Sequence, residues 1–115
     1  MIASFLSDAQ RAQLIANGRM ALAQQDFDPL PVVKLFTPDA GATWLLSELD
    51  ESGEICFGLC DLGMGFPEIG YVALAELSAV RGLMNRPIEQ DLHFHADKTL
   101  SAYAHEARLH GRIQA

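Results

Sequence analysis

The sequence contains few cysteines, no long apolar run and no leader-like start. Cys56 and Cys60 are the two cysteines, too few for the disulfide framework of a small secreted domain. No apolar run approaches the roughly 18 residues that a membrane-spanning helix requires. Residues 1–6 lack the basic and long apolar regions of a signal peptide. These absences predict a soluble, cytoplasmic protein without a membrane partner.

Basic residues are also scarce. Eight Lys and Arg stand against fifteen Asp and Glu, which gives a formal net charge of −7. An acidic surface repels a phosphate backbone, and direct nucleic-acid binding then loses its main driving force. A basic protein partner, or mimicry of the charge of a nucleic acid, remains open. Solubility alone is the simpler explanation of the charge.

The composition is that of one folded domain. The chain has 115 residues, of which 50% are hydrophobic and 20% are charged. This balance excludes intrinsic disorder, and the length suits a single core. We therefore expect one domain over residues 1–115, with residues 1–6 as a loosely packed lead-in.

Three segments show helical patterns. Residues 7–25 form the first predicted helix. Ser7 and Gln10 near its start predict a capping box. The apolar stripe of this helix is Leu14, Ile15, Gly18, Ala21 and Leu22. Residues 75–84 form a second predicted helix, with Asn85 as its C-terminal stop.

The third predicted helix covers residues 99–111. Thr99 is a suitable N-cap and Gly111 a suitable C-terminal stop. The inward-facing residues at helical spacing are Leu100, Tyr103, Ala104 and Ala107.

Five short segments have strand character, namely residues 32–36, 43–49, 54–62, 71–74 and 88–95. The connections between the first four are too short for parallel crossovers, which favours antiparallel neighbours. The predicted order is αββββαβα. This is an α+β domain with a mostly antiparallel sheet of about five strands and three helices against one face.

Residues 88–95 alternate most regularly. Ile88, Leu92 and Phe94 are expected to point inward, and the polar face consists of Glu89, Asp91, His93 and His95. Two histidines beside carboxylates could bind a metal or act in acid–base catalysis, so a metal-binding module or metal-assisted hydrolase is the alternative function. A solvent-facing strand surface is the simpler interpretation. No metal or cofactor is therefore assigned.

A zinc site built from both cysteines with His93 and His95 has suitable ligand atoms. On an extended strand, however, the Cα atoms of Cys56 and Cys60 would lie roughly 13 Å apart. That separation exceeds the reach of a disulfide and of one zinc ion. Buried, reduced thiols are the expected outcome.

The glycine-rich loop between residues 63 and 71 is the best candidate for recognition. Gly63, Gly65 and Gly70 allow sharp turns around the Phe66-Pro67-Glu68 tip. The partner-binding candidates are Trp44, Phe66, Glu68 and Tyr71, because aromatic anchors dominate many interfaces. Alternatively, Phe66 and Tyr71 tuck into the core, and Trp44 belongs to the core or rim of the sheet.

Three stretches carry a resemblance to a known family, namely VVKLFTPDAGATWLLSELD, FGLCDLGMGFPEIGYVALAEL and PIEQDLHFHADKTLSAY. Together they resemble the bacterial family named domain of unknown function 2958. Ala75 departs from its pattern, which tends to have a serine helix cap there. The resemblance implies an accessory gene of plasmids and integrated elements, and it provides no established activity to carry over.

No nucleophile motif occurs in the sequence. Together with the acidic surface and the loop, this favours a non-enzymatic interaction protein of a mobile genetic element. Its expected partner is a host or element-encoded protein, and interference with a defence nuclease is one concrete version.

Overall fold

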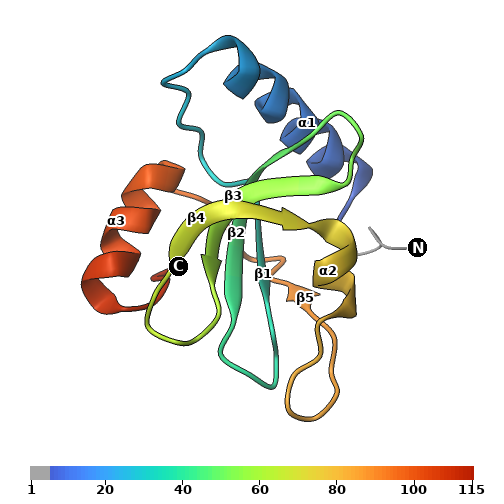
Figure 1. Cartoon of the computed structure of the whole chain (residues 1–115), viewed down its shortest axis with the longest axis vertical. Helices are drawn as coiled ribbons and strands as arrows, with labels where there is room; N and C mark the ends of the chain where they lie inside the picture. Colours follow the sequence, from blue (N-terminus) through green and yellow to red (C-terminus); the bar gives the residue numbers. More distant parts are fainter. Residues whose placement is uncertain (1–5) are drawn as a thin grey trace.

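Short turns join the first four strands, so each strand lies antiparallel to the one before it (Figure 1). The computed structural model describes residues 6–115. Its helices are α1 (Asp8–Ala23), α2 (Leu74–Ala79) and α3 (Leu100–His110). Its strands are β1 (Val33–Phe36), β2 (Thr43–Leu49), β3 (Ile55–Asp61), β4 (Glu68–Ala73) and β5 (Glu89–Gln90). The predicted α+β class and the order αββββαβα are confirmed.

The five strands form one antiparallel sheet in the order β4-β3-β2-β1-β5. β3 and β4 pair without interruption from Ile55↔Ala73 to Cys60↔Glu68. Between β2 and β3 the register shifts between Leu46 and Glu48, where the sheet has a bulge. β4 and β5 are therefore the two edge strands.

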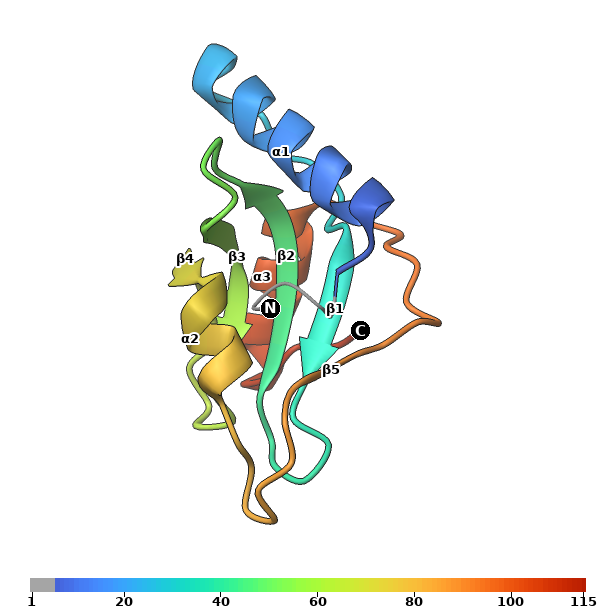
Figure 2. The ribbon, with the colours of Figure 1, turned by 90° about the vertical axis from the view of Figure 1, so that its right-hand side faces the viewer.

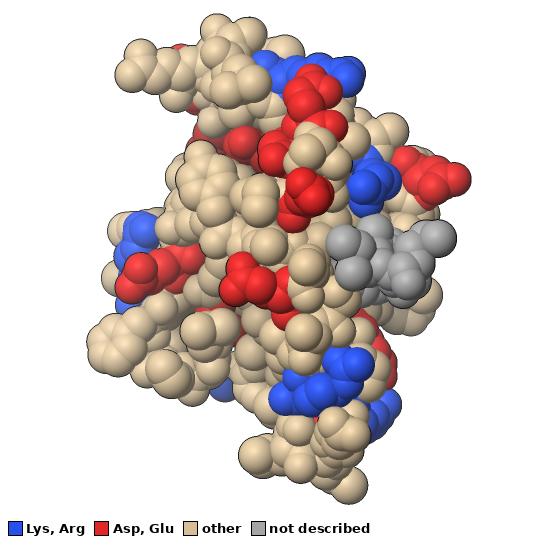
Figure 3. Space-filling view, turned by 45° about the vertical axis from the view of Figure 1, so that its right-hand side comes forward, with Lys and Arg blue, Asp and Glu red and all other residues tan. Residues whose placement is uncertain are grey.

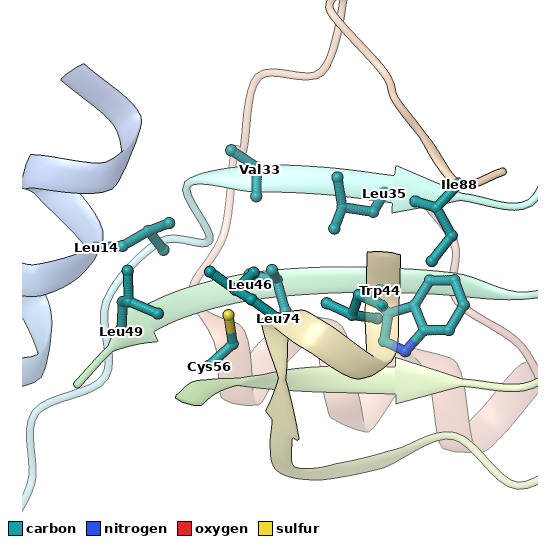
Figure 4. Close-up of a cluster of buried hydrophobic side chains, with 10 residues drawn as sticks. Leu14, Val33, Leu35, Trp44, Leu46, Leu49, Cys56, Leu74 and Ile88 are labelled. Carbon is teal, nitrogen blue, oxygen red and sulfur yellow. The ribbon is translucent and has the colours of Figure 1, made fainter. Parts of the chain in front are cut away.

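Helices cover both faces of the sheet (Figure 2), which corrects the expectation that all three pack on one. Adjacent strand residues point to opposite faces, so Leu46 and Leu45 belong to different clusters. Figure 4 shows the first cluster, where Leu14 of α1 and Leu74 of α2 meet the strands. In the second cluster, α3 packs over Leu45 and Leu59.

The two longer helices follow their predicted caps. Ser7 and Gln10 form the capping box of α1. Leu14 is buried, but Leu22 is exposed, so the predicted stripe is wrong at its C-terminal end. Gly18 lies against the Leu49 carbonyl, where a Cβ would collide. Buried Asn17 donates a hydrogen bond to the Ser47 carbonyl at 2.9 Å.

The last helix agrees with its prediction. Thr99 caps α3, and Gly111 ends it in the left-handed conformation at φ 72°. All four residues expected to face inward are buried. The predicted lead-in lies outside the described residues apart from Leu6, which packs against the first cluster. No helix within residues 6–115 combines the length and apolar character needed to cross a bilayer.

The second helix is shorter than predicted. α2 ends at Ala79, because Val80 is extended and a tight turn over residues 82–86 follows. The Asp39 carboxylate holds this turn by accepting from the amides of Met84 (2.6 Å) and Arg86 (3.3 Å). Asn85 has a positive φ of 62°, as a helix stop would, but it lies inside this turn.

The prediction of one strand over residues 88–95 is wrong beyond Gln90. The Asp91 carboxylate accepts from the His93 amide at 2.9 Å, and the Asp91 carbonyl accepts from the Phe94 amide at 3.3 Å. These bonds turn the chain out of the sheet. Leu92 is consequently 78% exposed instead of buried, whereas Ile88 is buried and Phe94 packs partly against the second cluster.

Candidate functional site

Asp61 anchors the loop of residues 62–67 that joins β3 to β4. Its buried carboxylate accepts a hydrogen bond from the Gly63 amide at 2.9 Å and another from the Ile113 amide at 3.0 Å. Gly63 and Gly65 adopt positive φ, and a Cβ on Gly63 would press against the Gly41 carbonyl oxygen. Pro67 is buried at the other end. The loop therefore has a fixed base.

The same loop and β4 direct apolar side chains into solvent. Phe66 is 78% exposed and Tyr71 is 76% exposed. Leu62 and Met64 are exposed as well, and with Ile69 these side chains line one hollow of about 380 Å³. We call Leu62, Met64, Phe66, Ile69 and Tyr71 the β4 surface. The alternative that Phe66 and Tyr71 are buried in the core is therefore wrong.

Tyr71 connects the β4 surface to a second hollow. Its ring lies 4.9 Å from that of Phe57, its partner across the β3–β4 pair. Both rings line a groove of about 340 Å³ between the end of α1 and the β2–β3 hairpin. Glu48 lines the same groove, and burial raises the pKa of its carboxyl. The exposed apolar area thus continues around β4 toward α1.

Of the other two partner-binding candidates, Trp44 lies in the core and Glu68 lines the hollow of the β4 surface. Trp44 is 3% exposed and belongs to the first cluster, because its side chain points from β2 toward the α2 face (Figure 4). The prediction that Trp44 contributes to an accessible binding surface is therefore wrong, and the alternative that it belongs to the core is what the structure shows. Glu68 is exposed, but it begins β4 instead of sitting on the loop tip.

The predicted polar face of residues 89–95 is not one row. Glu89 pairs with Arg86 at 2.8 Å, and Asp91 faces Lys34 at 3.6 Å. His93 and His95 are exposed on the loop that follows, where they line a hollow of about 260 Å³ with Asp91. Within the described part of the chain, no three His, Cys, Asp or Glu residues come close enough to hold a metal ion.

The two cysteines differ in burial, because Cys56 is buried and Cys60 is half-buried. Both lie in β3, as predicted, and both are free thiols. Cys56 is packed in the first cluster, and burial raises its pKa to about 12. Burial also raises the pKa of Cys60. The Cys56 thiol is therefore protonated and unreactive at neutral pH. The four-ligand zinc site is not assembled among residues 6–115.

Negative charge is concentrated in one part of the chain. Residues 35–80 contain eight Asp and Glu and no Lys, Arg or His, so the remainder of the chain carries almost balanced charge. Of these eight acids, only Glu51 pairs with a cation in the described structure, namely Arg19. Figure 3 shows acidic side chains down the middle of one face, with basic ones toward its margins.

Sequence reasoning missed several members of this region. Leu62 and Met64 alternate with glycines before Phe66, an apolar pattern in a turn that could have identified them. Ile69 could have been found as the neighbour of Tyr71 on one strand face. Glu48 could not, because the bulge after Leu46 changes which face it occupies.

Comparison with curated proteins and with solved structures finds no match. A family model described as "Protein of unknown function (DUF2958)" matches residues 5–114. That match covers nearly the whole chain and all eight elements. The resemblance carried by the three sequence stretches is thereby confirmed, and the chain belongs to the DUF2958 family.

Proposed function

We propose that the chain is a non-enzymatic binding module that holds another protein against the β4 surface. The observation that carries the proposal is the group of exposed apolar side chains on one loop and one edge strand. Contiguous exposed apolar groups often mark interaction sites, and aromatic residues such as Phe66 and Tyr71 tend to supply most of the binding energy.

The fixed base of the loop supports the same function. Asp61 holds Gly63 and Ile113 before any partner arrives, so Met64 and Phe66 are already positioned. A preorganised loop loses less conformational entropy on binding than a disordered one. The loop geometry therefore suits recognition.

The partner would be a host or element-encoded protein met in the cytoplasm. This partner follows from the mobile-element context that the family resemblance implies, because such an element would benefit from a protein that engages a host factor. An acidic binding module suits a partner with a basic surface, as a nucleic-acid-binding enzyme has. A defence nuclease is the concrete version we propose.

Affinity capture with matched variants tests this function. The variant Phe66→Ser with Tyr71→Ser removes two exposed aromatic groups from the β4 surface. Its control is Leu83→Ser with Met84→Ser, which removes two side chains that are 93% and 78% exposed on a different loop. We expect a specific partner from host lysate to bind the wild type and the control alike. Capture by the first variant should fall at least tenfold.

The result is read by quantitative mass spectrometry of cross-linked complexes. Near-ultraviolet circular dichroism of each variant checks that the fold is retained. Equal capture by the wild type and the Phe66/Tyr71 variant would remove the β4 surface from the function. Loss of capture in the Leu83/Met84 variant alone would move the binding site to residues 82–86.

A further inference from the structure

Among residues 6–115, no strand neighbours the outer edge of β4. β4 ends the strand order, and in Figure 2 it lies at the margin of the sheet with no described element beyond it. β3 pairs with its inner edge along all six residues. A row of backbone donors and acceptors along the outer edge is thus open to solvent.

The register identifies which groups these are. The Leu74 amide donates to the Glu54 carbonyl at 2.8 Å, which continues the β3–β4 ladder. Hydrogen-bonded and non-hydrogen-bonded pairs alternate in an antiparallel ladder. Gly70 and Val72 therefore direct their backbone groups at β3. Ile69 and Tyr71 direct theirs away from the sheet, and they also carry two apolar side chains of the β4 surface.

This edge lacks the features that usually block strand pairing. It has no lysine, no internal proline and no bulge against β3. A Cβ on Gly70 would meet no atom within 4 Å, so the space above the middle of the strand is open. An added strand would therefore find open space over one face of β4 at its middle.

Carboxylates surround the edge. Glu68 begins β4, and Glu54 and Glu76 lie beside its other end. Glu48 in the neighbouring groove has a carboxyl that burial has partly desolvated, and no cation pairs with it among the described residues. A second copy of the chain would bring two such acidic groups together. A basic segment would neutralise them.

We propose that β4 accepts one extended, basic segment of the partner protein as a sixth strand. The segment's backbone pairs with Ile69 and Tyr71, its apolar side chains lie on the β4 surface, and its Lys or Arg side chains face the carboxylates. This inference rests on the proposed function and specifies its binding mode.

A peptide library tests the mode without knowledge of the natural partner. The probe is a phage-displayed library of random 12-residue peptides selected on the intact protein. We expect selected peptides to alternate apolar residues with Lys or Arg. Their affinity should fall several-fold between 50 and 300 mM salt. Selection of acidic or uncharged peptides, or of no peptide, overturns the proposal.

Two substitutions of Tyr71 separate strand pairing from side-chain contact. Tyr71→Pro removes the outward amide hydrogen but no ladder bond to β3, a position where an edge strand tolerates proline. Tyr71→Val removes the ring and keeps the amide. We expect the proline variant to bind the selected peptide at least tenfold more weakly than the valine variant. Equal affinities would overturn strand addition and leave the proposed function standing.

The peptide itself supplies a readout that does not depend on how a variant folds. N-methylation of the peptide amides that face β4 should abolish binding, and methylation of the intervening amides should not. Hydrogen exchange should slow at the Ile69 and Tyr71 amides on binding. The Gly70 and Val72 amides should be slow already in the free protein. Uniform tolerance of methylation, or unchanged exchange at Ile69 and Tyr71, overturns the proposal.

Analytical ultracentrifugation tests whether a second copy of the chain occupies the edge of β4. We expect the wild type to sediment as a monomer. A wild-type dimer that becomes monomeric in Tyr71→Pro would assign the edge to a second copy and overturn the proposal. Failure of the proposed function would be seen separately, as equal partner capture by the wild type and the Phe66/Tyr71 variant.

Discussion

The two edges of the sheet are built differently. β4 has six residues in unbroken register with β3, and no strand in the described part of the chain pairs with its outer edge. β5 has two residues, its Glu89 pairs with Arg86, and the chain turns away at Asp91. A short, charged edge that ends in a turn is protected from pairing, whereas a regular apolar edge is not. The difference indicates that exposure at β4 is specific to that edge.

The largest expected effect is a difference in unfolding free energy between glycine substitutions in β4 and in its neighbour β3. Gly58 and Gly70 are cross-strand partners, but a Cβ on Gly58 would collide with the Leu45 carbonyl, whereas one on Gly70 meets nothing. Gly58→Ala should cost about 3 kcal/mol of unfolding free energy. Gly70→Ala should be neutral or stabilising by less than about 1 kcal/mol. Urea denaturation of the two variants measures both. Similar losses would mean that the β4 edge is as closely packed as the interior.

A smaller effect is expected at the β5 edge. Asp91→Asn loses the charge that faces Lys34 but keeps an oxygen for the His93 amide, whereas Asp91→Val loses both. The valine variant should therefore be about 1 kcal/mol less stable than the asparagine variant. Chemical denaturation gives the difference. Equal stability would show that the side chain of Asp91 does not end this strand.

The smallest effect concerns Glu48, near the open edge. Burial raises the pKa of this carboxyl in the folded state. The folded protein therefore binds a proton more tightly than the unfolded chain, and the ionised side chain lowers stability as the pH rises above its ordinary pKa. Glu48→Gln should raise the melting temperature slightly at pH 7 and leave it unchanged at pH 3. A gain of the same size at both pH values would contradict this origin.

Local signals were sufficient for the long elements. Ser7 and Gln10 identify the start of α1, and Thr99 and Gly111 identify both ends of α3. The signals lie within a few residues of the elements they control, so a single sequence contains them. The short connections likewise predicted the antiparallel order of β1 to β4.

The errors arose where one side chain competes with a periodic pattern. Residues 88–95 alternate as a strand does, but Asp91 bonds its own downstream backbone and turns the chain. The end of α2 depends on Asp39, which is distant in sequence and captures the turn over residues 82–86. Such a tertiary contact leaves no local sign.

The candidate site also has parts that the sequence predicted and parts that it did not. Phe66, Glu68 and Tyr71 were named as partner-binding candidates, beside the alternative that Phe66 and Tyr71 tuck into the core, and all three are exposed. Trp44 was not separable from the core by sequence alone, because aromatic residues favour strands on either face. The open outer edge of β4 required the strand order, which depends on all five strands at once.

The separation of charge along the chain also has a kinetic consequence. Because residues 35–80 contain no cation, the field around this part of the molecule attracts a positively charged body before contact is made. Long-range attraction accelerates encounter and is screened by salt, whereas the lifetime of a complex depends on its short-range contacts. Added salt should therefore slow the arrival of a basic partner far more than it hastens its departure.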